Sequence, residues 1–248
     1  MKNTIKIATI GCSLFLAAPA YAELESEIHA GYHGMYEFRG VDFGDDLYEA
    51  GVDLSYELCA GLSLSGGAWW AQSATEDELD LYIGLTKTIG LVDISVGHTT
   101  YWFPGDVSKG TSATADSNEV YIGASTELWE SIGLSLTYFY DYDAIEAGYL
   151  EGEISRSFEL PLPVNLDVSA GAAWSMDYNP QTTAAGGGSL SGFNHWFVSA
   201  AFPWQVIDDV TLTPYFKYVG GGSDLNNAQS IDASEDLYYG GVTLSVAF

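Results

Sequence analysis

Carboxylates dominate the side chains of this chain that could do chemistry. The sequence has 34 Asp and Glu against 7 Lys and Arg, which gives a formal net charge of -27. Because contacts to phosphate need basic side chains, this balance argues against nucleic acid and other polyanions as partners. In a confined passage, fixed negative charge attracts cations and repels anions.

One set of charged residues occupies alternate positions that would share one face of predicted strands. The set is Glu37, Arg39, Glu49, Asp53, Glu119, Glu127, Glu151, Glu153 and Lys217. If the strands close into a barrel, these side chains line the interior together with inward aromatic residues that narrow it. Arg39 then forms an ion pair that holds the first two strands together, through Glu37, Glu49 or Asp53, or it contacts a solute or a gate.

Acidic residues also gather between the predicted strands. Asp42, Asp45 and Asp46 offer hard oxygen ligands of the kind that Ca²⁺ or Mg²⁺ prefers, although their spacing is not that of an EF-hand loop. Divalent ions held there would also bridge lipid phosphates. The alternative is an ordinary solvated rim.

No motif predicts an enzyme. Ser–His hydrolysis needs a serine on the same face as a histidine, and none can be assigned to His98. Once a signal peptide is removed, Cys59 is the sole cysteine, so a disulfide and a thiolate metal cluster are both excluded.

The elements that must position these residues are long segments with a period of two. We predict strands at 27–40, 47–58, 62–72, 79–88, 92–102, 119–129, 132–142, 149–160, 164–175, 194–203, 210–220 and 237–248. Apolar residues occupy one face and small, polar or acidic residues the other, as in Tyr48 to Leu58. Segments of about 10 residues suit a tilted membrane strand. With apolar residues facing lipid, the chain predicts a transmembrane antiparallel up-and-down β-barrel of about twelve strands.

Connection lengths and aromatic residues support this prediction. Short gaps such as 59–61 and 89–91 alternate with longer ones such as 41–46, 103–118 and 176–193, as expected for periplasmic turns and extracellular loops. Aromatic residues form two interfacial belts. The belt near the long loops contains Tyr36, Phe38, Tyr48, Trp70, Trp102, Tyr138, Tyr140, Trp174, Trp196 and Tyr238, and the belt near the turns contains Tyr56, Trp129, Phe158, Phe202 and Phe248. Arg156 is an exception to the pattern, because its position in the alternation places its side chain on the lipid-facing side. Either a bulge shifts the register there, or Arg156 lies close enough to the membrane surface to reach the headgroups.

Residues 1–22 have the pattern of a secretory signal peptide. Lys2 and Lys6 precede an apolar stretch, and Ala20-Tyr21-Ala22 resembles a cleavage site. The barrel domain is therefore expected to span 23–248. Its last strand ends on Phe248, which we expect the barrel-insertion machinery to recognise.

Short stretches of the chain resemble a family of small bacterial outer-membrane proteins, conserved hypothetical proteins and porins among them. Tyr36, Arg39 and Gly40 match a Tyr-x-x-Arg-Gly pattern at the end of the first strand, and 78–84 resembles a later segment. This resemblance implies an outer-membrane barrel of about twelve strands and no particular substrate.

The sequence thus predicts a monomeric bacterial outer-membrane barrel, in contact with lipid and lipopolysaccharide. Its predicted function is that of a narrow porin-like channel for cations or small neutral solutes. The alternative is a non-conducting structural or adhesion barrel whose acidic loops bind divalent ions.

Overall fold

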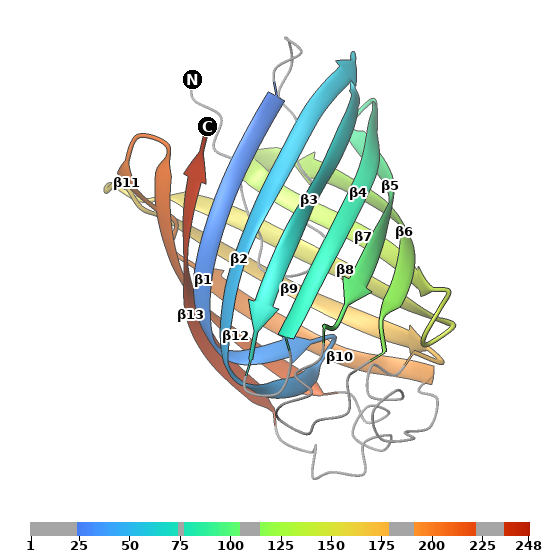
Figure 1. Ribbon diagram of the computed structural model, residues 1–248. Helices are drawn as coiled ribbons and strands as arrows, with labels where there is room; N and C mark the ends of the chain where they lie inside the picture. Colours follow the sequence, from blue (N-terminus) through green and yellow to red (C-terminus); the bar gives the residue numbers. More distant parts are fainter. Residues whose placement is uncertain (1–23, 74–76, 105–114, 179–190, 222–235) are drawn as a thin grey trace.

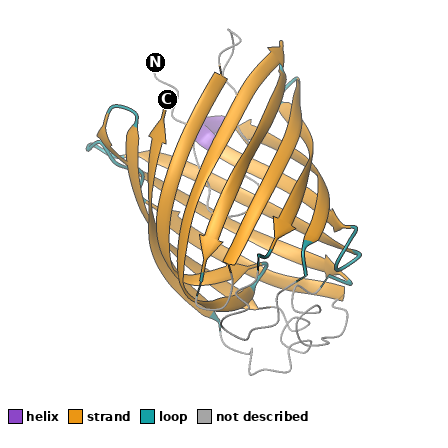
Figure 2. Cartoon of the chain, in the orientation of Figure 1, coloured by secondary structure: helices purple, strands orange, loops and turns teal. Residues whose placement is uncertain are grey.

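The computed structural model describes residues 24–73, 77–104, 115–178, 191–221 and 236–248. In this part of the chain, twelve antiparallel strands form a closed barrel and one short strand is added to it (Figures 1 and 2). The strands are β1 (Leu24–Phe38), β2 (Val41–Cys59), β3 (Leu62–Gln72), β4 (Asp77–Ile89), β5 (Val92–Trp102), β6 (Ser117–Leu128), β7 (Ile132–Asp141), β8 (Ala147–Glu159), β9 (Asn165–Met176), β10 (Ser191–Ala201), β11 (Trp204–Ile207), β12 (Val210–Gly221) and β13 (Leu237–Ala247). The predicted fold is confirmed, and the predicted signal peptide, 1–22, lies outside the described residues.

The first and the last strand of the chain pair with each other and close the barrel. β1 pairs with β13, and β10 pairs with β12, so every strand of the ring has two neighbours. β11 lies in the connection between β10 and β12, a small addition to the predicted short gap there. It pairs with β12, and its Trp204 makes one isolated bridge to Val164. The described part of the chain contains no helix that is long and apolar enough to cross a membrane.

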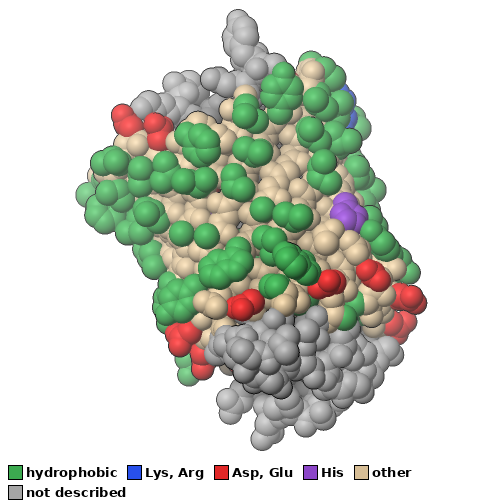
Figure 3. Space-filling view, in the orientation of Figure 1, with side chains coloured by type: hydrophobic (Ala, Val, Ile, Leu, Met, Phe, Trp, Pro, Cys, Tyr) green, Lys and Arg blue, Asp and Glu red, His purple; other side chains and the backbone are tan. Residues whose placement is uncertain are grey.

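Side chains alternate between the outside and the inside of the barrel because strand residues point to opposite faces. On β2, Tyr48, Leu54 and Leu58 are exposed on the outside, whereas Glu49 is buried inside. Apolar side chains are spread over the visible outer face, and acidic side chains lie toward the two ends of the barrel (Figure 3). Apolar residues outside and acids inside reverse the soluble pattern and suit a lipid solvent.

The two ends of the barrel differ as the connection lengths predict. The start of β1 and the end of β13 lie at the end with the short turns, where the Phe248 N–H donates to the Ser26 carbonyl at 3.0 Å (Figure 1). β3, β5, β9 and β12 end at the other end of the barrel, where the strands that follow them begin.

The first hairpin departs from the prediction. Residues 41–46, expected as a loop, belong to β2, and only Arg39 and Gly40 separate β1 from β2. Tyr36 and Phe38, expected in the lipid-facing belt, are inside: Tyr36 is 5 % exposed and packs against Trp69. The segment from Asp42 to Asp46 has the polar composition of a loop. For this reason its sequence does not indicate that it continues β2 beyond the membrane-spanning wall of the barrel.

Arg156 lies on the lipid-facing side of β8. Its pairing with Ile132 belongs to an unshifted register, so no bulge turns it inward. Its guanidinium lies 4.8 Å from the ring centre of Phe158, near the end with the short turns. This position is the one that lets a long basic side chain reach the headgroups.

The lipid exposure of the outer face gives a first prediction. Ile122, in the middle of β6, is 53 % exposed on this face. We expect Ile122→Arg to lower the free energy of unfolding by about 2–4 kcal/mol, because a charge at mid-depth must leave water. Denaturant titration in lipid vesicles measures this change. Leu91→Arg, in the β4–β5 turn, is the control and should cost about 0–1 kcal/mol. Equal small effects at both positions would contradict a lipid-facing Ile122.

Candidate functional site

The β1–β2 hairpin bends out of the barrel wall and into the interior. The register of β1 against β2 shifts between Met35 and Glu37, which is the sign of a bulge. On the facing strand, Gly44 and Asp46 have positive φ values of 125° and 59°. Bulges bend a strand, and the first hairpin accordingly curves across the lower end of the barrel in Figure 1.

The tip of this hairpin is a two-residue turn. Phe38 pairs with Val41, and the two residues between them, Arg39 and Gly40, have φ values of 53° and 81°. Two positive φ angles are characteristic of a type I′ turn, whose twist matches that of the flanking strands. Gly40 also needs to be small, because a Cβ there would lie 2.8 Å from Nδ1 of His195 on β10.

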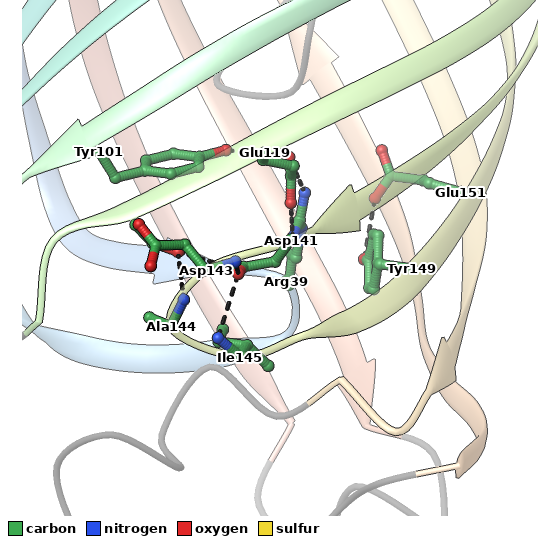
Figure 4. A network of polar contacts seen from close by, with 10 residues as sticks. Arg39, Tyr101, Glu119, Asp141, Asp143, Ala144, Ile145, Tyr149 and Glu151 are labelled. Atoms are coloured by element: carbon green, nitrogen blue, oxygen red, sulfur yellow. Dashed lines mark hydrogen bonds and ion pairs between the residues drawn. The ribbon is translucent and has the colours of Figure 1, made fainter.

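Arg39 makes a bidentate ion pair with Glu119 of β6. Its Nη1 and Nη2 groups donate to the two carboxylate oxygens at 2.7 and 2.8 Å, and Tyr101 donates to the same carboxylate at 3.1 Å (Figure 4). Arg39 is 8 % exposed and Glu119 1 %. A bidentate pair of this kind is strong and directional, and burial makes the loss of either partner costly.

Aromatic rings surround the Arg39 guanidinium. The distances from its Cζ to the ring centres are 4.9 Å for Phe38, 4.8 Å for Phe139, 4.4 Å for Tyr149 and 4.5 Å for Tyr178. Rings at this distance attract a cation through their electron-rich faces. Phe139, Tyr149 and Tyr178 belong to one buried apolar cluster on the far wall.

These contacts span the barrel. β7, which carries Phe139, is six strands from β1 in either direction around the ring. The turn that follows β7 is itself held in place, since Asp141 accepts hydrogen bonds from the N–H groups of Asp143 and Ile145 at 3.0 and 3.1 Å (Figure 4). The hairpin tip therefore crosses the interior and docks on the opposite wall.

The second interior cation holds the same hairpin, at a residue close to its tip. Lys217 of β12 donates to Glu37 at 2.5 Å, and Tyr239 donates to the same carboxylate oxygen at 3.0 Å. The other oxygen of Glu37 accepts the Gly40 N–H at 2.6 Å. The predicted ion pair of Arg39 with Glu37, Glu49 or Asp53 is therefore wrong: Arg39 pairs across the barrel, and Lys217 takes Glu37.

The remaining predicted lining residues lie on interior faces of their strands. Glu49 accepts a hydrogen bond from Trp69 Nε1 at 2.5 Å, and Asp53 accepts one from Tyr82. Glu151 accepts one from Tyr149 at 3.1 Å. Glu153 shares the face of Glu151 and pairs with Gly171, whereas Glu127 is exposed near the short-turn end of β6.

The acidic residues predicted to bind a metal are spread along the hairpin. Asp42 accepts the Gly44 N–H at 2.8 Å, and Asp46 accepts the Tyr32 hydroxyl at 2.6 Å. Asp45 is exposed and pairs with Met35 in the strand register. Ca²⁺ or Mg²⁺ binding by Asp42, Asp45 and Asp46 stays a prediction.

The sequence analysis missed the partners of Arg39. Glu119, Phe139 and Tyr149 are distant in sequence, and only their inward parity was visible. One further signal was present: Arg39-Gly40 has the form of a two-residue hairpin turn, in which Asn or Asp usually precedes the glycine. An arginine at that strained position suggests that its side chain has a specific partner.

The chain has the fold of outer-membrane channels of known structure. A structure of the KdgM porin has a TM-score of 0.53 at 11% identity, over 90% of this chain and 99% of that chain. The KdgM porin in complex with disordered oligogalacturonate has a TM-score of 0.51 at 10% identity, over 90% and 99%. An outer membrane channel from Pseudomonas putida F1 has a TM-score of 0.54 at 10% identity, over 93% and 97%. No protein-family model and no curated protein matches the chain by sequence.

The docked hairpin gives a second prediction. We expect Glu119→Gln to release it, because the variant leaves the Arg39 charge buried without its counterion, which costs about 3–5 kcal/mol. Backbone amides 39–44 should exchange with solvent at least about a hundredfold faster, while those of the wall strands stay unchanged. Glu127→Gln, on the same face of β6, is the matched control. Unaltered exchange at 39–44 in Glu119→Gln would show that the ion pair does not hold the hairpin.

Proposed function

We propose that this chain is a bacterial outer-membrane channel of porin type that passes cations or small neutral solutes and rejects anions. The observation that supports the proposal most is the balance of interior charge. Of the Lys and Arg residues in the described part of the chain, Arg39 and Lys217 are the ones inside, and each is already paired with a carboxylate. Interior acids beyond those two pairs include Glu27, Glu49, Asp53, Glu78, Asp93, Asp141, Glu151 and Glu153.

An excess of fixed negative charge in a narrow passage raises the local concentration of cations and opposes anions. An acidic sugar chain such as the oligogalacturonate bound by the KdgM porin is a poor fit for such an interior. Both interior cations would have to leave their partners to contact one. Lipopolysaccharide at the acidic rim and insertion machinery at Phe248 are further proposed partners.

The second candidate function is a non-conducting structural or adhesion barrel. The observation that favours it is the β1–β2 hairpin, whose tip lies across the interior and contacts the opposite wall. In this case the acids would serve solvation, and the rim carboxylates of Asp42, Asp45 and Asp46 would bind divalent ions. The two functions differ in whether ions pass.

Ion selectivity tests the leading proposal. Purified barrels in a planar bilayer under a KCl gradient should give a reversal potential of the sign expected for a K⁺-selective channel, since the interior carboxylates outnumber the interior Lys and Arg and oppose Cl⁻. Oligogalacturonate added to either chamber should not reduce the current. A Cl⁻-selective current would contradict the proposal. The absence of current in the parent and in hairpin variants would favour the structural barrel.

The hairpin should limit conductance. We expect Glu119→Gln to raise the single-channel conductance above that of the parent, because the released tip no longer crosses the interior. Glu127→Gln removes one charge from the same face of β6, near the short-turn end, and should leave the conductance close to that of the parent. Equal conductance in all three proteins would show that the ion path avoids the hairpin.

A further inference from the structure

Three side chains with metal-binding atoms meet inside the barrel, away from the hairpin tip. Glu27 and His29 occupy successive inward positions on β1, and Asp53 of β2 is the cross-strand partner of Glu27. One ligand atom from each residue lies within 4.8 Å of the others. Glu27 also pairs with Ala247 of β13, which puts the group near the short-turn end of the barrel.

Two atoms of this group are buried without a hydrogen-bond partner. Glu27 is 5 % exposed, and its Oε1 is unpartnered. His29 has a side chain that is 9 % exposed; its Nδ1 lies 3.3 Å from Asp53 Oδ2 but makes no hydrogen bond. A buried polar atom without a partner costs about 1–3 kcal/mol, so Glu27 Oε1 in particular is expected to bind a ligand. His29 Nδ1 already has Asp53 Oδ2 at ion-pair distance.

Neighbouring residues fix the positions of the His29 and Asp53 side chains. Gly51, opposite His29 in the register, leaves room for the imidazole, because a Cβ there would lie 2.5 Å from its Cε1 and Nε2 atoms. Tyr82 donates its hydroxyl to Asp53 Oδ1, so Oδ2 is the oxygen that faces His29. Hydrogen bonds of this kind to a ligating carboxylate fix its orientation and strengthen metal binding.

We propose that Glu27, His29 and Asp53 bind one divalent transition-metal ion of the Zn²⁺ class. One imidazole nitrogen and two carboxylate oxygens are a donor set that Zn²⁺ accepts, and an open fourth position can hold water. Ca²⁺ instead takes six to eight oxygen ligands and gains little from imidazole. The proposal goes beyond the channel function and does not depend on it, because binding can be measured whether or not ions pass.

Interior water is the competing explanation for the unpartnered atoms. Asp93 Oδ1 on β5 and Asp167 Oδ1 on β9 are also buried without hydrogen-bond partners. Neither belongs to a group of three metal-binding side chains in the described part of the chain. Asp93→Asn therefore removes one buried interior carboxylate without removing a proposed ligand, which makes it the matched control.

Calorimetric titration of the folded barrel in detergent tests the site. The probes are ZnCl2 and CaCl2, added separately in metal-free buffer at neutral pH. The parent should bind one Zn²⁺ saturably and Ca²⁺ at least about tenfold more weakly. Glu27→Gln and His29→Gln should each weaken Zn²⁺ binding at least about tenfold, since even an outer partner of a metal ligand contributes about 10–100-fold. Asp93→Asn should change it less than about twofold.

Heat-dependent gel mobility identifies the folded variants, and Asp53→Asn replaces any of the others that fails to fold. Two patterns would overturn the proposal. One is the absence of saturable Zn²⁺ binding in the parent, which leaves water as the occupant. The other is an equal loss of affinity in Asp93→Asn, or equal affinity for Ca²⁺, which would reduce the effect to interior charge alone.

Discussion

The ion pair between Arg39 and Glu119 is the contact on which the interior of this barrel depends. It joins a hairpin tip to the opposite wall, and both partners are buried. A buried charge without its counterion is strongly destabilising. The hairpin must therefore have a shape and surroundings that bring Arg39 to Glu119. The hairpin must bend, which Gly44 and Asp46 permit through their positive φ angles. The tip must be thin, which Gly40 provides, and aromatic rings must replace the water that Arg39 has lost.

The barrel wall is subject to a different constraint, because its outer side faces hydrocarbon instead of water. Every backbone N–H and C=O in such a solvent needs a partner, and only a closed ring of strands supplies one along its whole edge. Outside, the wall is apolar; inside, acids greatly exceed bases. The two paired cations leave the remaining carboxylates to define the field that a solute would meet. In the proposed channel, selectivity by charge and restriction by the hairpin would thus come from separate parts of the structure.

The wall could be predicted from the sequence because lipid imposes a strict period of two. The observed β3 and β5 have the predicted bounds, 62–72 and 92–102, and Glu49, Asp53, Glu119 and Lys217 lie on the predicted interior face. The hairpin could not be predicted. Asp42 to Asp46 has the composition of a solvated loop, and a strand inside the barrel is not subject to the lipid period. The partner of Arg39 was also hidden, since pairing across the barrel is set by three-dimensional closure and not by neighbours in sequence. The group of Glu27, His29 and Asp53 required the register of β1 against β2.

The distance between the hairpin and the opposite wall tests the central claim most directly. Spin labels at Asp42→Cys and Asp143→Cys, in a Cys59→Ser background, report this distance in lipid by pulsed electron resonance. A docked hairpin predicts one short, narrow distance distribution, which lengthens and broadens when Glu119→Gln is added. A long or broad distribution that is the same with and without Glu119→Gln would contradict the account.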